Sequence, residues 1–324
     1  MKLRLFLPLL LMAMTTTAQM STIYVTRNIL KQAGDMYSSQ HDIVNLVVPP
    51  NRESFWDKYD NSIWTYMLLG LDAYFFVEAD NNNGEREYHG LYLYRSQNVT
   101  KLLDNGRDAT AFATGSEAYL AATDGIYVFD YKNGTIKKYG TLTDNIIQIE
   151  ANYKTGVLYF VSNDHQVFTV ADEGTKKNKV NINDAQEIAF DFNNNMYYYD
   201  GKKDLYVLNQ DGNKKIEGIP KGGEIILVKP TWRNMGVFAV VGNDVYLLNA
   251  NGSARKINVV LQIKPTAYAQ QSTNYLYFAL DKTIFRFQAE RVHLSHIADL
   301  DEYYDVINYQ DYNGLGFGNP SQEN

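Results

Sequence analysis

Oxygen-bearing side chains recur in short polar segments between the apolar runs of this 324-residue sequence. Asp144, Asn145, Asp184 and Glu224 stand in such segments. Carboxylate and amide oxygens are the ligands that Ca²⁺ and Mg²⁺ take, so a convergence of these four side chains would form a site for a hard divalent cation. Asp and Asn are also the ordinary residues of tight turns, and that alternative stays open beside the calcium hypothesis.

A second group of side chains is suited to holding an organic ligand. It combines an arginine, which can pair with a carboxylate, and three residues whose rings can stack on a flat molecule. The four residues are Arg107, Tyr88, His89 and His165. Tyr88 and His89 stand in the long polar segment 80–90, which is either a recognition loop or lid, or a tolerated surface insertion. The sequence therefore contains the parts of a site for a small aromatic ligand.

Several catalytic chemistries are disfavoured. The chain has no cysteine, which excludes thiol catalysis and cysteine-ligated zinc. None of the five histidines stands in a setting typical of a Ser-His-Asp hydrolase, and His293 and His296 are expected on opposite faces of one strand. The net charge of −7 disfavours nucleic acid and anionic membranes as partners. A non-enzymatic protein without an obligatory cofactor is favoured.

These candidate residues must be positioned by a repeat of about forty residues. Apolar four-residue segments recur at intervals of 35 to 40 residues, and further apolar runs flank each of them. Asn-Gly or Asp-Gly joins extended segments in several units, which is the preferred two-residue connection of a β-hairpin. The six segments are 91–94, 126–129, 166–169, 205–208, 245–248 and 284–287. The pattern predicts an all-β chain folded as a six-bladed β-propeller with four antiparallel strands per blade. A pair of β-sandwiches or a β-solenoid is the alternative architecture.

The repeats divide the chain into a propeller over 60–297, an N-terminal segment over 19–59 and a C-terminal tail over 298–324. The apolar stretch 42–48 is expected to pair with the last blade and close the ring. Lysines in the fourth strand of several units place that strand at the rim, where they discourage edge-to-edge association. The expected blades are 60–103, 108–139, 144–180, 184–219, 222–259 and 260–297.

The candidate ligand residues fall in loops that gather at one end of a propeller's central channel. These loops join the second and third strands of a blade, or join one blade to the next. Ligands commonly bind at this end of the channel. The fold therefore indicates where a ligand would bind, but it does not by itself indicate a function.

The amino end predicts export. Lys2 and Arg4 precede an apolar run over 5–14, and small residues follow, which is typical of a signal peptide over 1–18. This run is too short to span a membrane. We expect a secreted monomer that can carry sugar on the Asn-X-Ser/Thr sites at Asn98, Asn133 and Asn251.

Two segments of the repeats resemble a known family. The residues DGIYVFDY over 124–131 and NGRDA over 105–109 are similar to those of insect ommochrome-binding proteins, which are haemolymph carriers of lepidopteran pigment. The resemblance runs over the six repeats. It implies a secreted binding protein, without catalysis, for phenoxazinone pigments such as xanthommatin.

Two other functions remain open from the sequence. The gluconolactonase and regucalcin group shares the architecture, and its members hold a divalent cation on the axis with a Glu, an Asn and an Asp. Glu224, Asn145 and Asp144 have those residue types, so a cation-dependent lactonase is the first alternative. A scaffold for protein partners is the second.

Overall fold

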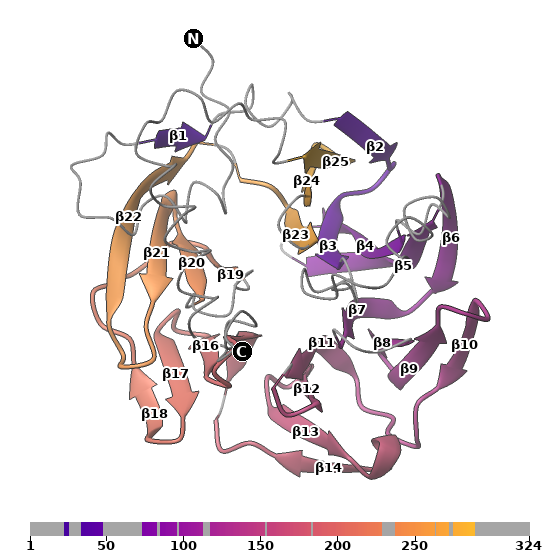
Figure 1. The fold of residues 1–324 in the computed structure, drawn as a ribbon, viewed down its shortest axis with the longest axis horizontal. Helices are drawn as coiled ribbons and strands as arrows, with labels where there is room; N and C mark the ends of the chain where they lie inside the picture. The colour runs from indigo at the N-terminus through magenta and orange to yellow at the C-terminus, as the bar shows by residue number, and fades with distance from the viewer. Residues whose placement is uncertain are drawn as a thin grey trace, which may run out of the picture.

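The computed structural model describes 23–25, 34–47, 73–82, 85–95, 97–112, 117–152, 154–182, 184–228, 237–262, 264–271 and 275–288. Within these residues the chain forms six antiparallel sheets arranged around a common axis (Figure 1), which confirms the six-bladed β-propeller. No helix in this part of the chain is long and apolar enough to cross a membrane. The expected signal peptide, the C-terminal tail, His293 and His296 lie outside the described residues.

Blades 1 to 4 each take four consecutive strands, hydrogen-bonded in chain order. Blade 1 consists of β3 (Ile43–Val47), β4 (Ala73–Asn82), β5 (Glu85–Arg95) and β6 (Asn98–Leu103). Blade 2 consists of β7 (Gly106–Ala111), β8 (Glu117–Ala122), β9 (Gly125–Asp130) and β10 (Thr135–Lys138). Blade 3 consists of β11 (Ile146–Asn152), β12 (Val157–Ser162), β13 (Val167–Ala171) and β14 (Lys176–Lys179). Blade 4 consists of β15 (Ala185–Phe190), β16 (Met196–Asp200), β17 (Leu205–Asn209) and β18 (Gly212–Lys215).

The last two blades each receive a strand from the start of the chain. Blade 5 consists of β19 (Ile225–Val228), β20 (Phe238–Val241), β21 (Asp244–Leu248) and β22 (Ala254–Leu261), with β1 (Ile23–Val25) added in parallel to β22. Blade 6 consists of β23 (Ala267–Gln271), β24 (Tyr275–Leu280) and β25 (Thr283–Gln288), and its outer strand is β2 (Gly34–Ser38).

The ring closes through β2, not through the segment expected from the sequence. The apolar stretch 42–48 does form a strand, but this strand is β3, which pairs with β4 as the inner strand of blade 1. The expected pairing of this stretch with the last blade is therefore wrong, and blade 1 begins before residue 60. The preceding strand β2 pairs antiparallel with β25 and completes blade 6. Consecutive strands at the start of the chain thus belong to the last and the first blade.

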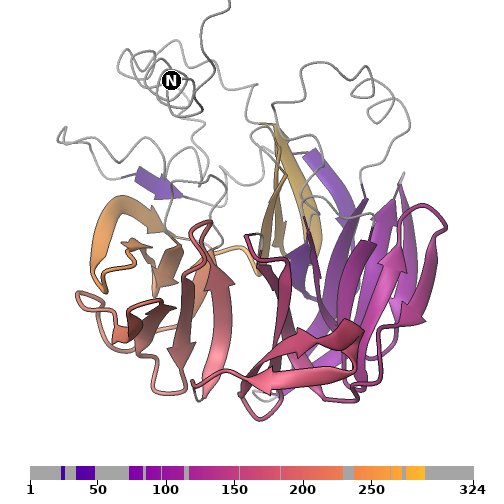
Figure 2. The same ribbon diagram turned by 60° about the horizontal axis from the view of Figure 1, so that its bottom comes forward.

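The blades pack because their middle strands are apolar on both faces, as β9 illustrates. Ile126 is fully buried against blade 3, where it packs in one cluster with Phe160. Phe129 points to the opposite face and meets Phe75 of blade 1 edge to face, with ring centroids 5.7 Å apart. Figure 2 shows the neighbouring sheets face to face around the ring. A strand covered on both faces requires the continuous apolar pattern that the sequence shows.

The Asp-Gly turn that precedes β9 depends on its glycine. Gly125 has a φ of +129°, and a Cβ atom added there would lie 2.1 Å from the carbonyl oxygen of Leu142. Leu142 belongs to the connection from blade 2 to blade 3. Only glycine allows both this backbone angle and this close approach.

A β-bulge recurs in the inner strands of blades 1 to 4. One residue of each inner strand has no partner in the ladder, and the residue that follows it is polar. The bulged residues are Val44, Arg107, Ile147 and Gln186. The polar residues that follow them are Asn45, Asp108, Gln148 and Glu187. Because bulges redirect side chains, this repeated feature determines what the inner strands present to their neighbours.

The polar residues after the bulges connect successive blades near the axis. Three of them accept a hydrogen bond from a backbone N–H of the next inner strand, at 2.7, 2.8 and 3.1 Å: Asp108 with Ile149, Gln148 with Ile188, and Glu187 with Leu227. The amide of Asn45 in blade 1 donates to Asp108 Oδ1 in blade 2. These contacts link blades 1 to 5 in sequence around the hub.

Candidate functional site

The segment expected as a long loop over 80–90 is a hairpin extension instead. Strand β4 continues to Asn82 and β5 starts at Glu85, so that both are longer than the strands of the other blades. Asp80 pairs with Glu87 across this extension. The segment reads as a loop from sequence because it is polar on both faces. It nevertheless forms strands because its backbone groups continue the β4–β5 ladder.

Arg107 lies at the meeting point of three blades. It is the bulged residue of β7 in blade 2, and its guanidinium carbon lies 4.9 Å from the ring centroid of Tyr88 in blade 1. Its Nη1 donates to Oδ1 of Asn163 in blade 3 over 3.3 Å. Its Nε is buried and has no hydrogen-bond partner among the described residues. The arrangement combines a cation, an aromatic face and an unused donor.

The other residues expected to bind a ligand or cation are engaged elsewhere. Asp144 forms an ion pair with Lys177, and Glu224 forms one with Lys264 over 3.3 Å. His165 has a left-handed φ of 57°, and its Nδ1 lies 3.2 Å from the carbonyl oxygen of Ala185.

Two further expected cation ligands also have roles in turns. Asn145 is exposed, and its backbone carbonyl accepts a hydrogen bond from the backbone of Asn163 at 2.8 Å. Asp184 accepts hydrogen bonds from the backbone N–H of Gly201 and the amide of Gln186, at 3.0 and 2.9 Å. The carboxylates of Asp144, Asp184 and Glu224 do not converge on one point. This favours the turn interpretation of these polar segments.

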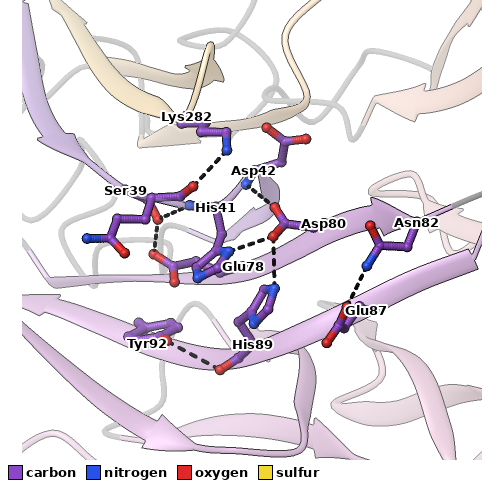
Figure 3. A network of polar contacts seen from close by, with 11 residues as sticks. Ser39, His41, Asp42, Glu78, Asp80, Asn82, Glu87, His89, Tyr92 and Lys282 are labelled. Atoms are coloured by element: carbon purple, nitrogen blue, oxygen red, sulfur yellow. Dashed lines mark hydrogen bonds and ion pairs between the residues drawn. The ribbon is translucent and has the colours of Figure 1, made fainter.

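A different group does converge, at the seam between blades 6 and 1 (Figure 3). His41 lies in the connection from β2 to β3, Asp80 lies on β4 and His89 on β5. His41 Nδ1 lies 2.7 Å and His89 Nε2 lies 3.0 Å from the same oxygen, Asp80 Oδ2. The two imidazole rings are stacked, with centroids 3.6 Å apart and planes inclined by 21°. Within the described residues this is the one group of three such side chains whose ligand atoms lie within 4.8 Å of one another.

Backbone and hydroxyl groups hold this cluster in place. The backbone N–H of Asp42 donates to the second oxygen of Asp80 at 3.3 Å. The hydroxyl of Ser39 accepts from the backbone N–H of His41 at 2.9 Å and donates to the buried carboxylate of Glu78 at 2.5 Å. The hydroxyl of Tyr37 also donates to Glu78, over 3.3 Å. The cluster is therefore anchored to a buried carboxylate through the seam connection.

The surroundings shift the acidity of these groups. The hydrogen bond from His41 lowers the pKa of Asp80 to about 2, so that this carboxylate stays ionised in acid. Burial, and then the nearby charge of Glu78, raise the pKa of Tyr37 and bring the pKa of Tyr92 to about 12. Both tyrosines therefore remain neutral hydrogen-bond donors beside the charged cluster.

Sequence reasoning identified His89 but missed His41 and Asp80. His41 precedes the apolar residues of β3, and Asp80 follows the apolar residues of β4, so both stand in polar segments where neither is distinctive. The sequence does contain one signal for this cluster. His41 and Asp42 are adjacent, and Asp80 and His89 stand nine residues apart in one hairpin. That signal has meaning only once β3 is known to lie beside β4.

Comparisons with known proteins do not assign a function. No protein-family model matches the chain, and no curated protein matches it. Many solved structures are similar to it, and three of them match most of its length. They are U3-55K (8% identity, 79% of this chain and 98% of that chain, TM-score 0.47), a structural genomics protein of unknown function from Bacteroides thetaiotaomicron VPI-5482 (13%, 79% and 72%, 0.49), and the extracellular domain of a putative one-component system from B. thetaiotaomicron (9%, 83% and 43%, 0.49). With TM-scores below 0.5 these likenesses carry no argument about ligand, partner or activity.

Proposed function

We propose that this propeller is a secreted, monomeric, non-enzymatic carrier that binds a small aromatic ligand bearing a carboxylate beside Arg107. The observation that supports this most is the position of the Arg107 guanidinium, over the ring of Tyr88 and with an Nε donor that no described residue accepts. Arginine presents a planar fork of donors that matches a carboxylate in two parallel hydrogen bonds. A ligand carboxylate that takes the place of Asn163 would pair with Nη1 at the surface and, as the second hydrogen bond, with the buried Nε that has no partner among the described residues.

The neighbouring side chains suit a flat ligand. Tyr88 is half-buried and extends an aromatic face next to the cation. Asn163 is exposed and makes only a long contact of 3.3 Å with Arg107, so a charged ligand group can displace it. The resemblance to ommochrome-binding proteins leads us to propose an ommochrome pigment such as xanthommatin as the ligand.

Secretion is part of the proposal, and the glycosylation sites are placed consistently with it. Asn98, Asn133 and Asn251 are all exposed and lie at or beside the turns between third and outer strands. N-linked sugars need such exposed positions. The cation-dependent lactonase alternative gains no comparable support, because the carboxylates of Asp144 and Glu224 are paired with lysines.

The test is a titration of the purified protein with xanthommatin, followed by the visible absorption band of the pigment and by tryptophan fluorescence. We expect saturable binding and a band shift. Arg107→Leu should weaken binding about 10-fold to 100-fold, because a hydrogen bond to a charged group contributes about 1.5–3 kcal/mol.

Arg255→Leu is the matched control. Arg255 is exposed on the outer strand β22, in blade 5, so this replacement should leave the affinity for the pigment unchanged. Tyr88→Ala should also weaken binding, through loss of the aromatic face. Absence of any spectral change at about 100 µM pigment, or equal affinity of Arg107→Leu and the native chain, would contradict the proposal.

A further inference from the structure

We propose that His41, Asp80 and His89 bind a divalent transition-metal ion, and that this ion fastens the ring-closing segment to blade 1. The proposed site is independent of the carrier function. It uses none of the residues that surround Arg107, and it lies at the seam between blades 6 and 1 (Figure 3).

Both imidazoles present a nitrogen to the same carboxylate oxygen, and the three ligand atoms lie within 4.8 Å of one another. Both imidazole nitrogens lie 2.7–3.0 Å from Asp80 Oδ2. In a tetrahedral site with bonds of about 2.0–2.1 Å, neighbouring ligand atoms lie about 3.3 Å apart. An outward movement of the side chains by about half an ångström, together with a tilt of the stacked rings away from parallel, would therefore admit an ion between the three ligand atoms.

The chemistry of the ligands selects the class of ion. Two imidazoles and one carboxylate suit Zn²⁺, Fe²⁺, Co²⁺ or Ni²⁺, whereas Ca²⁺ and Mg²⁺ prefer oxygen ligands alone. The side chains of His41, Asp80 and His89 are 32%, 32% and 25% exposed, so that an ion can enter from solvent and keep a water molecule as its fourth ligand. Zn²⁺ is the appropriate probe.

Hydrogen bonds from neighbouring groups hold Asp80 and His41 in place, as they do for the ligands of known metal sites. Ligating side chains are usually oriented by further hydrogen bonds. Here the backbone of Asp42 holds the second oxygen of Asp80, and Ser39 connects the backbone of His41 to the buried Glu78. The two imidazole rings are stacked with centroids 3.6 Å apart, which keeps Nδ1 of His41 and Nε2 of His89 on the same side of the cluster as Asp80 Oδ2.

The position of His41 gives the ion a structural role. His41 follows β2, the outer strand of blade 6, whereas Asp80 and His89 belong to blade 1. Among described residues the connection 39–42 is also held by hydrogen bonds to the backbone and side chain of Lys282, at 2.8 and 2.7 Å. The chain has no cysteine, so no disulfide can lock the ring. A metal across the seam would supply a cross-link at that place.

The experiment uses the full chain without a histidine tag, stripped of metal with a chelator and titrated with Zn²⁺ against a chromophoric indicator. We expect one ion per chain with micromolar or tighter affinity. Co²⁺ should produce visible absorption bands of a four- or five-coordinate site. Zn²⁺ at about 100 times its dissociation constant should raise the melting temperature by about 5–10 °C.

Variants separate this site from other histidines and from the carrier site. His41→Ala/His89→Ala should lose at least 100-fold in affinity, and Asp80→Asn, which preserves the shape, at least 10-fold. His165→Ala and Arg107→Leu should bind Zn²⁺ like the native chain. Far-ultraviolet circular dichroism identifies any variant that fails to fold, and in that case His89→Gln replaces the double variant.

Zinc binding weaker than about 100 µM, or equal binding by the double variant, would show that no site exists at the seam. Tight binding without a rise in melting temperature would refute the cross-link. Loss of pigment binding in Arg107→Leu with intact zinc binding would support both proposals separately.

Discussion

Asp108 connects three blades, and its replacement by alanine should destabilise the whole ring. The side chain is 5% exposed and belongs to blade 2. Its Oδ2 accepts from the backbone N–H of Ile149 in blade 3 at 2.7 Å, and its Oδ1 accepts from the amide of Asn45 in blade 1. Oδ1 also accepts from the backbone N–H of Ala109 at 2.8 Å. Alanine would leave these donors without an acceptor, and the contacts of the Ile149 and Ala109 N–H groups are buried, whereas that of Asn45 is half-buried.

The expected loss follows from the number of donors. A buried donor without a partner costs about 1–3 kcal/mol, and two buried donors, the N–H groups of Ile149 and Ala109, would lose their acceptor. The half-buried amide of Asn45 would also lose its contact with blade 2. Removing the buried carboxylate also relieves its own desolvation, which offsets part of this loss. The net decrease in unfolding free energy should be about 2–5 kcal/mol, which corresponds to about 4–20 °C in melting temperature.

The assay is urea unfolding followed by circular dichroism, with Asp164→Ala as the control. Asp164 is exposed in the β12–β13 turn and should change the unfolding free energy by less than about 0.5 kcal/mol. Asp108→Asn keeps one oxygen acceptor and should give an intermediate loss. Because Asp108 follows the bulge that presents Arg107, Asp108→Ala should weaken pigment binding as well. If Asp108→Ala is as stable as Asp164→Ala, the inter-blade hydrogen bonds do not hold the ring together.

Two further predictions concern the seam. The pKa of Asp80 is lowered to about 2 by the hydrogen bond from His41, so its contribution to stability is complete above the ordinary carboxyl pKa of about 4 and is lost as the pH falls towards 2. The difference in unfolding free energy between the native chain and Asp80→Asn should therefore shrink over this interval, and a constant difference would refute the assignment. Deletion of residues 1–38 removes β2 and exposes the edge of β25, so that this chain should melt earlier and associate through the free edge in size-exclusion chromatography. Deletion of residues 1–33, which retains β2, is the control, and identical behaviour of the two truncations would show that β2 does not close the ring.

The blades could be predicted because their signals are local. Ile126 and Phe129 point to opposite faces of β9, so this strand is apolar on both faces. Such a strand must be covered on both faces wherever it lies in the fold. The glycine of the preceding turn reflects a backbone angle that other residues rarely adopt. Six recurrences of the same pattern leave few architectures other than a closed ring of sheets.

The closing strand could not be predicted in the same way. Strand β2 has the sequence GDMYS, in which Met36 and Tyr37 alone offer large apolar surface to the core. An outer strand needs little apolar pattern, so its sequence resembles that of a loop. Its partner β25 stands almost at the other end of the described chain, and pairing at that separation is decided by the assembled ring.

The residue types of the candidate site could be predicted from the sequence, but the contacts between these residues could not. Arg107 and Tyr88 were both expected to contact a ligand, and the structure adds their contact across two blades. Asp144 and Glu224 were suited to a cation by type, but each lies within reach of a lysine that stands 33 or 40 residues away in sequence. The partners of a side chain depend on such distant neighbours, which the local sequence pattern does not contain.

The amino-acid sequence alone thus determined the apolar strands of the repeats, their hairpin turns and the number of blades, since alternation of apolar side chains and turn chemistry act between residues close in sequence. The tertiary structure decided which sheet receives residues 34–38 and which side chains meet at the seam. His41 and His89 stack only because β2 closes the last blade while β3 opens the first. Contacts of this kind depend on sheet order and register, and these are set by the packing of all six blades together.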